Sequence, residues 1–164
     1  MNDINENPQV VLKKTEPGDL ETLFVYQLDE EAAYMAAFIN ENWNDKDTYL
    51  AKWNKLLADD TVNIRTVFLD NKVVGSVLTW QLMGELQIAY GIVKEYWNKG
   101  IATSALQQFL AIVSERPLFG RVAFDNVGSA KVLTKCGFKK VKEETSYAYA
   151  RKKEIVEMVF LLEG

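Results

Sequence analysis

Hydrophobic residues recur along this chain with two periods, one typical of helices and one typical of strands. Helical spacing predicts helices over 16–28 with a continuation over 29–38, and over 47–58, 98–114 and 125–138. Alternation and short apolar runs predict strands over 9–14, 62–69, 73–80, 84–93 and 117–124, and two more between 139 and 162. This order, without repeats or linkers, predicts one α/β domain over 1–164, with a mixed central sheet of about six to seven strands and about four helices.

Several residues at the predicted boundaries favour particular helix ends. Asp19 follows Pro17 as a candidate N-cap for the first helix, and Asn126 is a candidate N-cap for the last. Gly137 stands where a left-handed residue ends a helix. Residues 1–8 are polar and are expected to form a flexible tail.

The composition narrows the class of protein. Of the 164 residues, 48% are hydrophobic and 26% are charged, which is typical of a globular domain. The net charge of −4 argues against a nucleic-acid binder that neutralises phosphates. The acidic start is unlike a signal peptide, and no apolar run approaches the length of a membrane helix. With Cys136 as the single cysteine, a reducing, cytoplasmic location is expected.

The chain has no histidine, which limits its chemistry. Ser-His-Asp and Cys-His mechanisms are excluded in their usual form. Most zinc sites are excluded as well, and no metal is expected, because Cys136 alone cannot supply the ligands. Acid–base steps are left to carboxylates, Tyr, Lys, Cys or water.

Gly100 stands at the head of the predicted helix 98–114, where a glycine costs about 1 kcal/mol relative to alanine. A helix that follows a strand directly presents free main-chain N–H groups and the positive end of its dipole. Gly100 and the small Ala102 leave these groups open to an anion, and Lys99 adds a positive charge. A pyrophosphate site and an ordinary helix start both fit these residues. The patterns G-x-G-x-x-G and G-x-x-x-x-G-K-[ST] are absent.

Two motifs together carry a resemblance to a known family. The stretch YWNKGIATSAL, residues 96–106, resembles the acyl-CoA-binding motif of the GNAT superfamily of N-acetyltransferases, and is closest to the subgroup of ribosomal-protein N-terminal acetyltransferases. The stretch NVGSAKVLTKCGF, residues 126–138, matches that family's N-x-x-S-x-x-x-L-x-K-x-G-F pattern. The resemblance covers most of residues 9–162.

The resemblance implies a set of residues that bind acetyl-CoA. The main-chain N–H groups that would hold the pyrophosphate belong to Trp97, Asn98, Lys99, Gly100, Ile101, Ala102 and Thr103. The pantetheine arm would follow the main chain of 91–93, including Ile92 and Val93, on a strand that splays from its neighbour. Asn126 and Ser129 would contact the same arm, although from the residues alone Asn126 is equally a helix cap. Asn98 replaces the subgroup's usual glycine, and it too accepts unusual backbone angles.

Acetyl transfer to an amine needs a group that takes a proton from the amine and one that gives a proton to the leaving thiolate. The resemblance places Gln87 where the subgroup often has Glu, and Gln is not a base. Glu85 lies two residues earlier on the same strand face and is the candidate base, with a solvated surface carboxylate as the alternative. The family's usual tyrosine position is Leu133 here, which leaves Tyr90 or Cys136 to consider as the donor, and Cys136 is expected to pack in the core.

The resemblance places the acceptor pocket at the first helices and the strand ends, with Tyr34, Trp43 and Trp80 as candidate lining residues, whereas Trp53 is expected in the core. The leading hypothesis is an acetyl-CoA-dependent N-acetyltransferase acting on a primary amine, either a protein N-terminus or a small amine. A non-catalytic acyl-CoA-binding or regulatory module and a binder of another phosphate ligand are the alternatives. The strand-rich C-terminus leaves a homodimer open.

Overall fold

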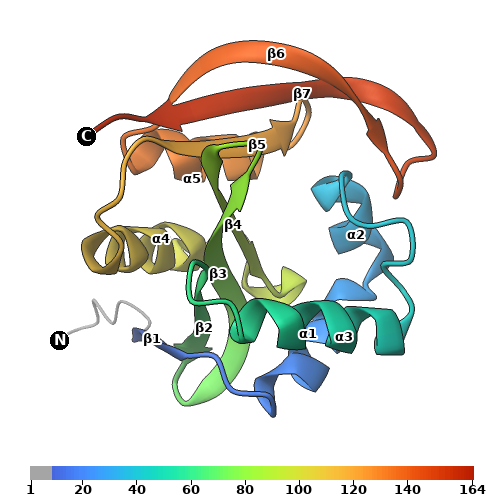
Figure 1. Cartoon of the computed structure of the whole chain (residues 1–164), viewed down its shortest axis with the longest axis vertical. Coiled ribbons are helices and arrows are strands. Elements are labelled where there is room, and N and C mark those ends of the chain that lie inside the picture. The colour runs from blue at the N-terminus through green and yellow to red at the C-terminus, as the bar shows by residue number, and fades with distance from the viewer. Residues whose placement is uncertain (1–8) are drawn as a thin grey trace, which may run out of the picture.

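The computed structural model describes residues 9–164, and these form five α-helices, one 3-10 helix and seven strands (Figure 1). The helices are α1 Asp19–Gln27, α2 Glu30–Ala36, α3 Lys46–Leu57, η1 Lys94–Tyr96, α4 Ile101–Ile112 and α5 Val127–Lys135. The strands are β1 Val10–Lys14, β2 Asn63–Leu69, β3 Lys72–Leu82, β4 Glu85–Ile92, β5 Leu118–Ala123, β6 Lys139–Ala148 and β7 Lys153–Leu162. The predicted fold class and the seven-stranded mixed sheet are confirmed. The predicted tail, 1–8, lies outside the described residues.

One sheet contains all seven strands, in the order β1-β2-β3-β4-β5-β7-β6. Every neighbouring pair is antiparallel except β4 and β5. These two strands pair only where Leu86–Ile88 lies beside Leu118–Gly120. Beyond this point β4 continues to Ile92 and β5 to Ala123 without pairing with each other, so the two strands part in the middle of the sheet. The splay expected for the strand before Gly100 is therefore present.

The helices cover the two faces of the sheet differently. Figure 1 shows α4 and α5 on one side of the central strands and α1, α2 and α3 on the other. The largest buried cluster joins α4 and α5 to the sheet, and it includes the fully buried Leu106 and Phe109 of α4 and Leu118 of β5. A smaller cluster joins α1 and α3 through Phe24 and Tyr49. Because α4 is anchored along its apolar face, its amino end is held at the splay.

Residues near the predicted helix ends predicted some of these ends correctly and others wrongly. Asn126 caps α5 through a hydrogen bond from the Ser129 N–H, and Gly137 is left-handed with φ of 96°, both as predicted. The prediction for Asp19 is wrong, because Gly18 is the N-cap of α1. The Asp19 carboxylate instead accepts a hydrogen bond from the Thr66 hydroxyl of β2, a tertiary contact that outweighs the local preference.

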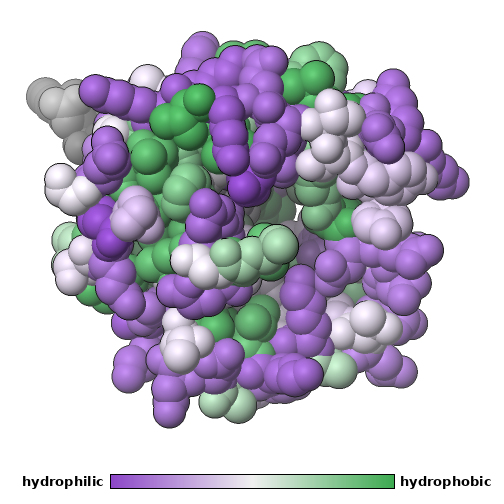
Figure 2. All heavy atoms as spheres, turned by 45° about the horizontal axis from the view of Figure 1, so that its top comes forward, coloured by the Kyte–Doolittle hydropathy of each residue, from purple (hydrophilic) through white to green (hydrophobic). Residues whose placement is uncertain are grey.

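The hairpin of β6 and β7 forms one end of the sheet, with β6 at the edge. Figure 2 brings this end forward and shows hydrophilic side chains over most of it, with smaller hydrophobic areas between them. The exposed Val141 and Tyr147 of β6 and Val156 of β7 belong to this hairpin. Pairing of β6 with a second copy stays a prediction. None of the helices in residues 9–164 has the length and apolar character needed to cross a membrane.

Candidate functional site

The amino end of α4 presents main-chain N–H groups that no side chain caps. Gly100 is the N-cap, and the first turn of α4 contains no acidic residue. The first N–H groups of a helix, here those of Ile101, Ala102 and Thr103, have no acceptor within the helix. Unpartnered N–H groups at the positive end of a 12-residue helix are a site for a phosphate.

Two left-handed residues shape the loop before α4. Asn98 has φ of 63° and Gly100 has φ of 79°. A Cβ atom at position 100 would meet no heavy atom within 4 Å, so the glycine is explained by its backbone angle and not by crowding. The space beside it is open to a ligand. The Lys99 ammonium lies 5.6 Å from the ring centre of Tyr96 and adds positive charge to the loop.

Trp97 ties the same loop to β4, because its indole N–H donates a hydrogen bond of 2.7 Å to the Ile92 carbonyl. The Val93 N–H in turn donates to the Val74 carbonyl at 2.8 Å. These two main-chain groups therefore have partners within the protein. Contacts of residues 91–93 with a pantetheine arm stay a prediction. They would have to involve main-chain groups of this segment other than the Ile92 carbonyl and the Val93 N–H.

The amino end of α5 faces the splayed part of β4. The Tyr90 hydroxyl lies 2.9 Å from both the carbonyl oxygen and the hydroxyl of Ser129. Burial raises the pKa of Tyr90 above its ordinary value, so its phenol is protonated at neutral pH. Asn126, besides capping α5, donates a hydrogen bond of 3.2 Å to the Met35 carbonyl of α2. Asn126 thus links α5 to α2.

Cys136 is the C-cap residue of α5, and its sulfur lies 3.8 Å from the Thr103 carbonyl oxygen of α4. Burial raises the pKa of its thiol, so Cys136 is not an activated nucleophile. Leu133, at the family's tyrosine position, is fully buried in the core. Of the groups considered as a proton donor, Tyr90 is the one that lies on the splayed strand.

On the face of the sheet away from α4, three side chains form a row across β3, β4 and β5. Gln87 is paired with Trp80 on one side and with Phe119 on the other. Gln87 is only 2% exposed, and its side-chain nitrogen has no hydrogen-bond partner among the described residues. An unpartnered buried donor costs about 1–3 kcal/mol, so this residue calls for a functional explanation.

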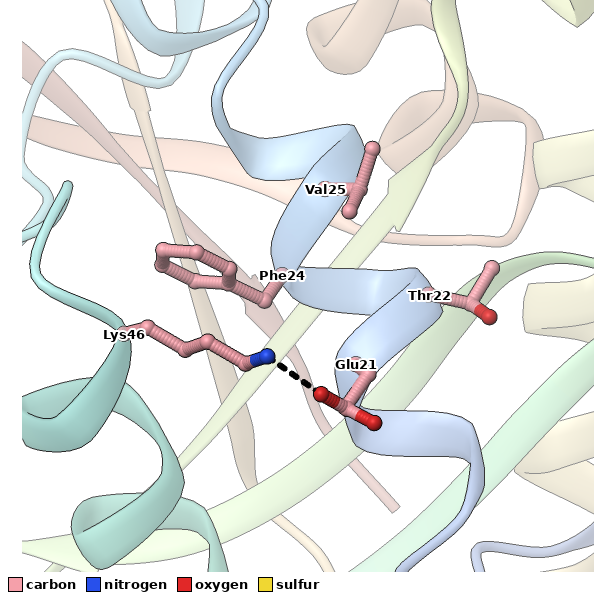
Figure 3. Close-up of a pocket in the computed structure, with 5 residues that line it drawn as sticks. All are labelled: Glu21, Thr22, Phe24, Val25 and Lys46. Atoms are coloured by element: carbon pink, nitrogen blue, oxygen red, sulfur yellow. Dashed lines mark ion pairs between the residues drawn. The ribbon is translucent and has the colours of Figure 1, made fainter.

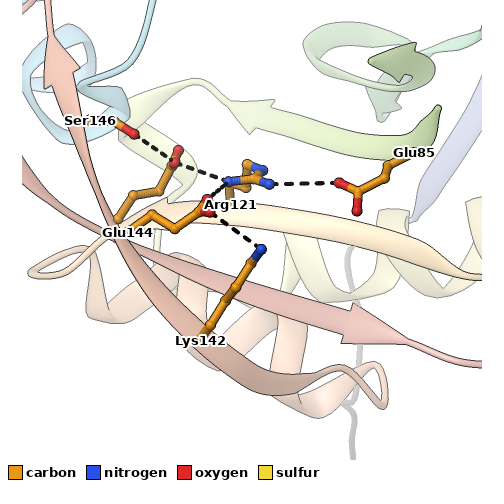
Figure 4. A network of polar contacts seen from close by, with 6 residues as sticks. Glu85, Arg121, Lys142, Glu144 and Ser146 are labelled. Atoms are coloured by element: carbon orange, nitrogen blue, oxygen red, sulfur yellow. Dashed lines mark hydrogen bonds and ion pairs between the residues drawn. The ribbon is translucent and has the colours of Figure 1, made fainter. Parts of the chain in front are cut away.

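Glu85 belongs to a polar network on the same face, centred on Arg121 of β5 (Figure 4). The Arg121 guanidinium contacts Glu85 at 3.8 Å, Glu157 at 3.3 Å and also Glu144. The hydrogen bond from Arg121 lowers the pKa of Glu144. Ser146 donates a further hydrogen bond of 3.2 Å to Glu157. Glu85 is therefore ion-paired at the start of β4, before the strands part, and its role as a base stays a prediction.

The three candidate acceptor residues come from different elements. Trp80 lies on β3 in the row with Gln87. Trp43 lies in the loop before α3, where its carbonyl accepts a hydrogen bond of 2.7 Å from Gln27. Tyr34 of α2 is stacked under the Arg151 guanidinium at 4.1 Å. Of the three, Trp80 is the one that belongs to the sheet itself, beside Gln87. Trp53 packs beside Tyr49 in the core, as predicted.

Arg151, in the turn between β6 and β7, fixes the position of α2. Its guanidinium makes two bonds of 2.9 Å to the Asp125 carboxylate and one to the Tyr34 carbonyl, also of 2.9 Å. The sequence did not predict this clamp or the Arg121 network, because each arginine is separated from the carboxylates it contacts by 23 residues or more and no local motif joins them.

The clamp predicts an acid-sensitive contribution to stability. Hydrogen bonding by Arg151 lowers the pKa of Asp125 below its ordinary value, so the stabilisation is present above that value and is lost as pH falls through the folded-state pKa. We expect D125N to be less stable than wild type at pH 7, and the difference to shrink as pH is lowered from 5 towards 2. Urea denaturation across this range measures it, and a difference that is independent of pH would contradict the assignment.

Two surface pockets lie away from the amino end of α4. The first, of about 310 Å³, is lined by α1 and by Lys46 at the start of α3, where Lys46 is ion-paired with Glu21 (Figure 3). The second, of about 480 Å³, lies at the turn between β3 and β4 and includes Glu85 and Phe119 in its lining. The first contains none of the predicted site residues, and the second contains only Glu85. Nowhere in residues 9–164 do three or more His, Cys, Asp or Glu side chains form a group suited to a metal ion.

Comparison with known proteins gives the same picture as the motifs. Residues 9–139 match a family model described as an acetyltransferase (GNAT) domain. No curated protein matches the chain. Many solved structures are similar to almost the whole chain, and three of them are described below. Their sequence identities are low, so the similarity is evidence for the fold only.

The first is an acetyltransferase of the GNAT family from Bacillus anthracis, 17% identical, with a TM-score of 0.77 and 96% of each chain covered. The second is spermidine N-acetyltransferase from Vibrio cholerae in complex with CoA and spermine, 19% identical, with a TM-score of 0.74, covering 93% of this chain and 95% of that one. The third is ribosomal-protein-S5-alanine acetyltransferase from Vibrio fischeri, 20% identical, with a TM-score of 0.74, covering 98% and 95%.

Proposed function

The chain belongs to the GNAT acetyltransferase family, and from this premise we propose that it is an acetyl-CoA-dependent N-acetyltransferase that acts on a primary amine. The observation that carries the proposal is the uncapped amino end of α4 beside the parting of β4 and β5. Such a helix end accommodates the phosphates of acetyl-CoA, and such an opening accommodates its thioester arm.

The hydrogen-bond donors at the amino end of α4 fit the diphosphate of acetyl-CoA. The N–H groups of Ile101, Ala102 and Thr103 would hold the diphosphate, with Asn98 and Gly100 giving the loop the backbone angles that expose them. The arm would run between the splayed strands towards Ile88 and Gly120, where pairing begins and further passage is blocked. This geometry would hold the thioester at the middle of β4.

The acceptor is proposed to be a protein N-terminus or a small amine. The similar structures include a spermidine N-acetyltransferase and a ribosomal-protein-S5-alanine acetyltransferase, which are amine-modifying proteins of both kinds. Their sequence identities to this chain, 19% and 20%, do not favour one of the two kinds. We therefore propose a primary amine as the acceptor, without choosing between them.

In the proposed reaction the amine nitrogen attacks the carbonyl carbon of the thioester, the N–C bond forms and the C–S bond breaks. One proton leaves the amine and one reaches the thiolate, so no oxidant or further co-reactant is needed. Glu85 is the proposed proton acceptor. It would act through water, because it precedes the splay and is held by Arg121.

Replacing Glu85 with Gln tests this role. We expect kcat to fall about 10-fold near pH 7, less than for a base in direct contact, since water relays the proton. The loss should shrink at higher pH, where more of the amine is already deprotonated. E144Q is the matched control, because it removes another carboxylate from the same Arg121. Equal pH profiles for the two variants would refute Glu85 as the base.

Tyr90 is the proposed proton donor to the thiolate, since its phenol is protonated and lies on the splayed strand against Ser129. We expect Y90F to lower kcat about 10-fold while leaving the Kd for acetyl-CoA unchanged. The matched control is Y26F, which removes a phenol that donates to the Val73 carbonyl. Steady-state kinetics and calorimetry measure both effects, and a Y90F enzyme with full kcat would remove Tyr90 from the mechanism.

Two measurements test the function itself. Isothermal titration should detect acetyl-CoA binding, and acetyl-CoA at 100 times its Kd should stabilise the fold by about 2.7 kcal/mol. Release of free CoA thiol with a panel of primary amines should exceed the amine-free rate. Binding without release would favour the non-catalytic acyl-CoA module, and displacement by unrelated nucleotides would favour a binder of another phosphate ligand.

A further inference from the structure

Gln87 is one of three side chains in residues 9–164 with a buried polar atom that has no hydrogen-bond partner, beside Thr79 and Arg121. Its side-chain nitrogen is shielded from solvent and has no acceptor within residues 9–164. A methionine or leucine of similar size would fill the same space without an unpartnered donor. A group that is held in place although it weakens the fold is typical of a functional site.

The place of Gln87 in the sheet indicates what it serves. It belongs to the three-residue segment in which β4 and β5 still pair, and the pairing ends at the next residue, Ile88. An arm that enters the splay from the amino end of α4 must stop here. Gln87 therefore lies beside the end of the path, on the face away from α4 and in a row with Trp80 and Phe119.

We propose that Gln87 is a catalytic residue whose side-chain N–H donates a hydrogen bond to the carbonyl oxygen of the acetyl thioester. This inference rests on the proposed function. The amine acceptor changes from one substrate class to another, but the acetyl carbonyl oxygen is present in every turnover. A neutral amide cannot act as a base, and what it offers at this point is a donor.

The donor matters most as the N–C bond forms. The electron pair of the C=O double bond then moves onto the oxygen, and a hydrogen bond to that oxygen becomes stronger as its charge grows. When the C–S bond breaks, the pair returns and the charge passes to sulfur. Gln87 gives up no proton in this cycle. Because solvent does not reach the side-chain nitrogen in the free protein, the side chains around it must shift when the thioester binds.

The variant Q87M tests the proposal, since methionine has a similar length and no donor. We expect kcat to fall about 100-fold, as for loss of one donor to a developing oxyanion, with an unchanged Kd for acetyl-CoA. The melting temperature should hold or rise, because an unpartnered donor has been removed. T79V is the matched control: the Thr79 hydroxyl is also buried and unpartnered, but Thr79 pairs with Ile88 and so lies on the opposite face. Its kcat should not change.

The variant Q87E separates a donor from a base. Charged groups of the network on the same face are Glu85 of β4, Arg121 of β5, Glu157 of β7, and Glu144 and Lys142 of β6. A glutamic acid donates only when protonated, so kcat of Q87E relative to wild type should fall as pH rises. A relative kcat that rises with pH would instead assign a base to this position and overturn the proposal.

The remaining outcomes are also decisive. Wild-type kcat in Q87M, or a loss of kcat matched by an equal loss in T79V, would overturn the role of Gln87 and leave the proposed function intact. A wild-type protein that binds acetyl-CoA and transfers no acetyl group would overturn both. If Q87M does not fold, Q87E at high pH takes its place as the variant without a donor.

Discussion

Replacing Gly100 with valine is expected to weaken acetyl-CoA binding about 100-fold. A 100-fold loss corresponds to about 2.7 kcal/mol, and charge-assisted hydrogen bonds contribute about 1.5–3 kcal/mol each, so the loss of one or two phosphate contacts at the amino end of α4 accounts for this factor. A side chain at position 100 would project into space that is open in the free protein, where it would meet the phosphates first. Isothermal titration of the purified variant measures the change.

Valine also strains the backbone, and two further variants separate this effect from the loss of binding. A β-branched residue at φ of 79° costs roughly 1–2 kcal/mol. G84V introduces the same strain in the β3–β4 turn, where φ is 83° and a Cβ also meets nothing, so it should lower stability and leave acetyl-CoA affinity unchanged. G100N tolerates the left-handed angle and adds bulk, so it should fold normally and bind poorly. Normal affinity in both G100V and G100N would contradict the assignment of this helix end.

The parts of the fold that the sequence predicted well depend on neighbours in the chain. Asn126 caps a helix that begins at the next residue, and Gly137 follows the C-cap of that helix, two residues before β6 begins. Hydrophobic spacing located all seven strands for the same reason. The first two helices were harder to predict. The sequence predicts 29–38 as a continuation of the helix over 16–28, but the cap at Asp29 makes α2 a separate helix, so five helices form where about four were expected.

What the sequence could not supply is tertiary pairing. Arg121 meets Glu85, Glu144 and Glu157 because β4, β5, β7 and β6 are neighbours in the sheet, an order that differs from the chain order. The Trp97 contact with Ile92 and the missing partner of Gln87 likewise depend on how the elements pack. The loop proposed to bind the coenzyme could therefore be predicted from a motif, whereas the ion pairing of Glu85, the proposed base, could not.

The second large effect is expected from Gly75→Ala, a change of one methyl group in β3. A Cβ atom at position 75 would lie 2.0 Å from the Gly91 carbonyl oxygen and 2.9 Å from Cδ1 of Ile92. The first of these is main chain and cannot rotate away, so β3 and β4 must separate locally. Overpacking that moves a backbone costs about 3 kcal/mol, and chemical denaturation should show a loss of this size.

The matched control lies directly across this contact. Gly91 pairs with Ser76, and a Cβ at position 91 would meet no atom within 4 Å, so G91A should keep wild-type stability or exceed it slightly. The comparison also has a functional side, because the main chain that G75A displaces is the 91–93 segment proposed to contact the pantetheine arm. In the folded fraction of G75A, acetyl-CoA affinity should therefore fall. If G75A binds acetyl-CoA as tightly as wild type does, the segment takes no part in binding, and the arm must follow a different path through the splay.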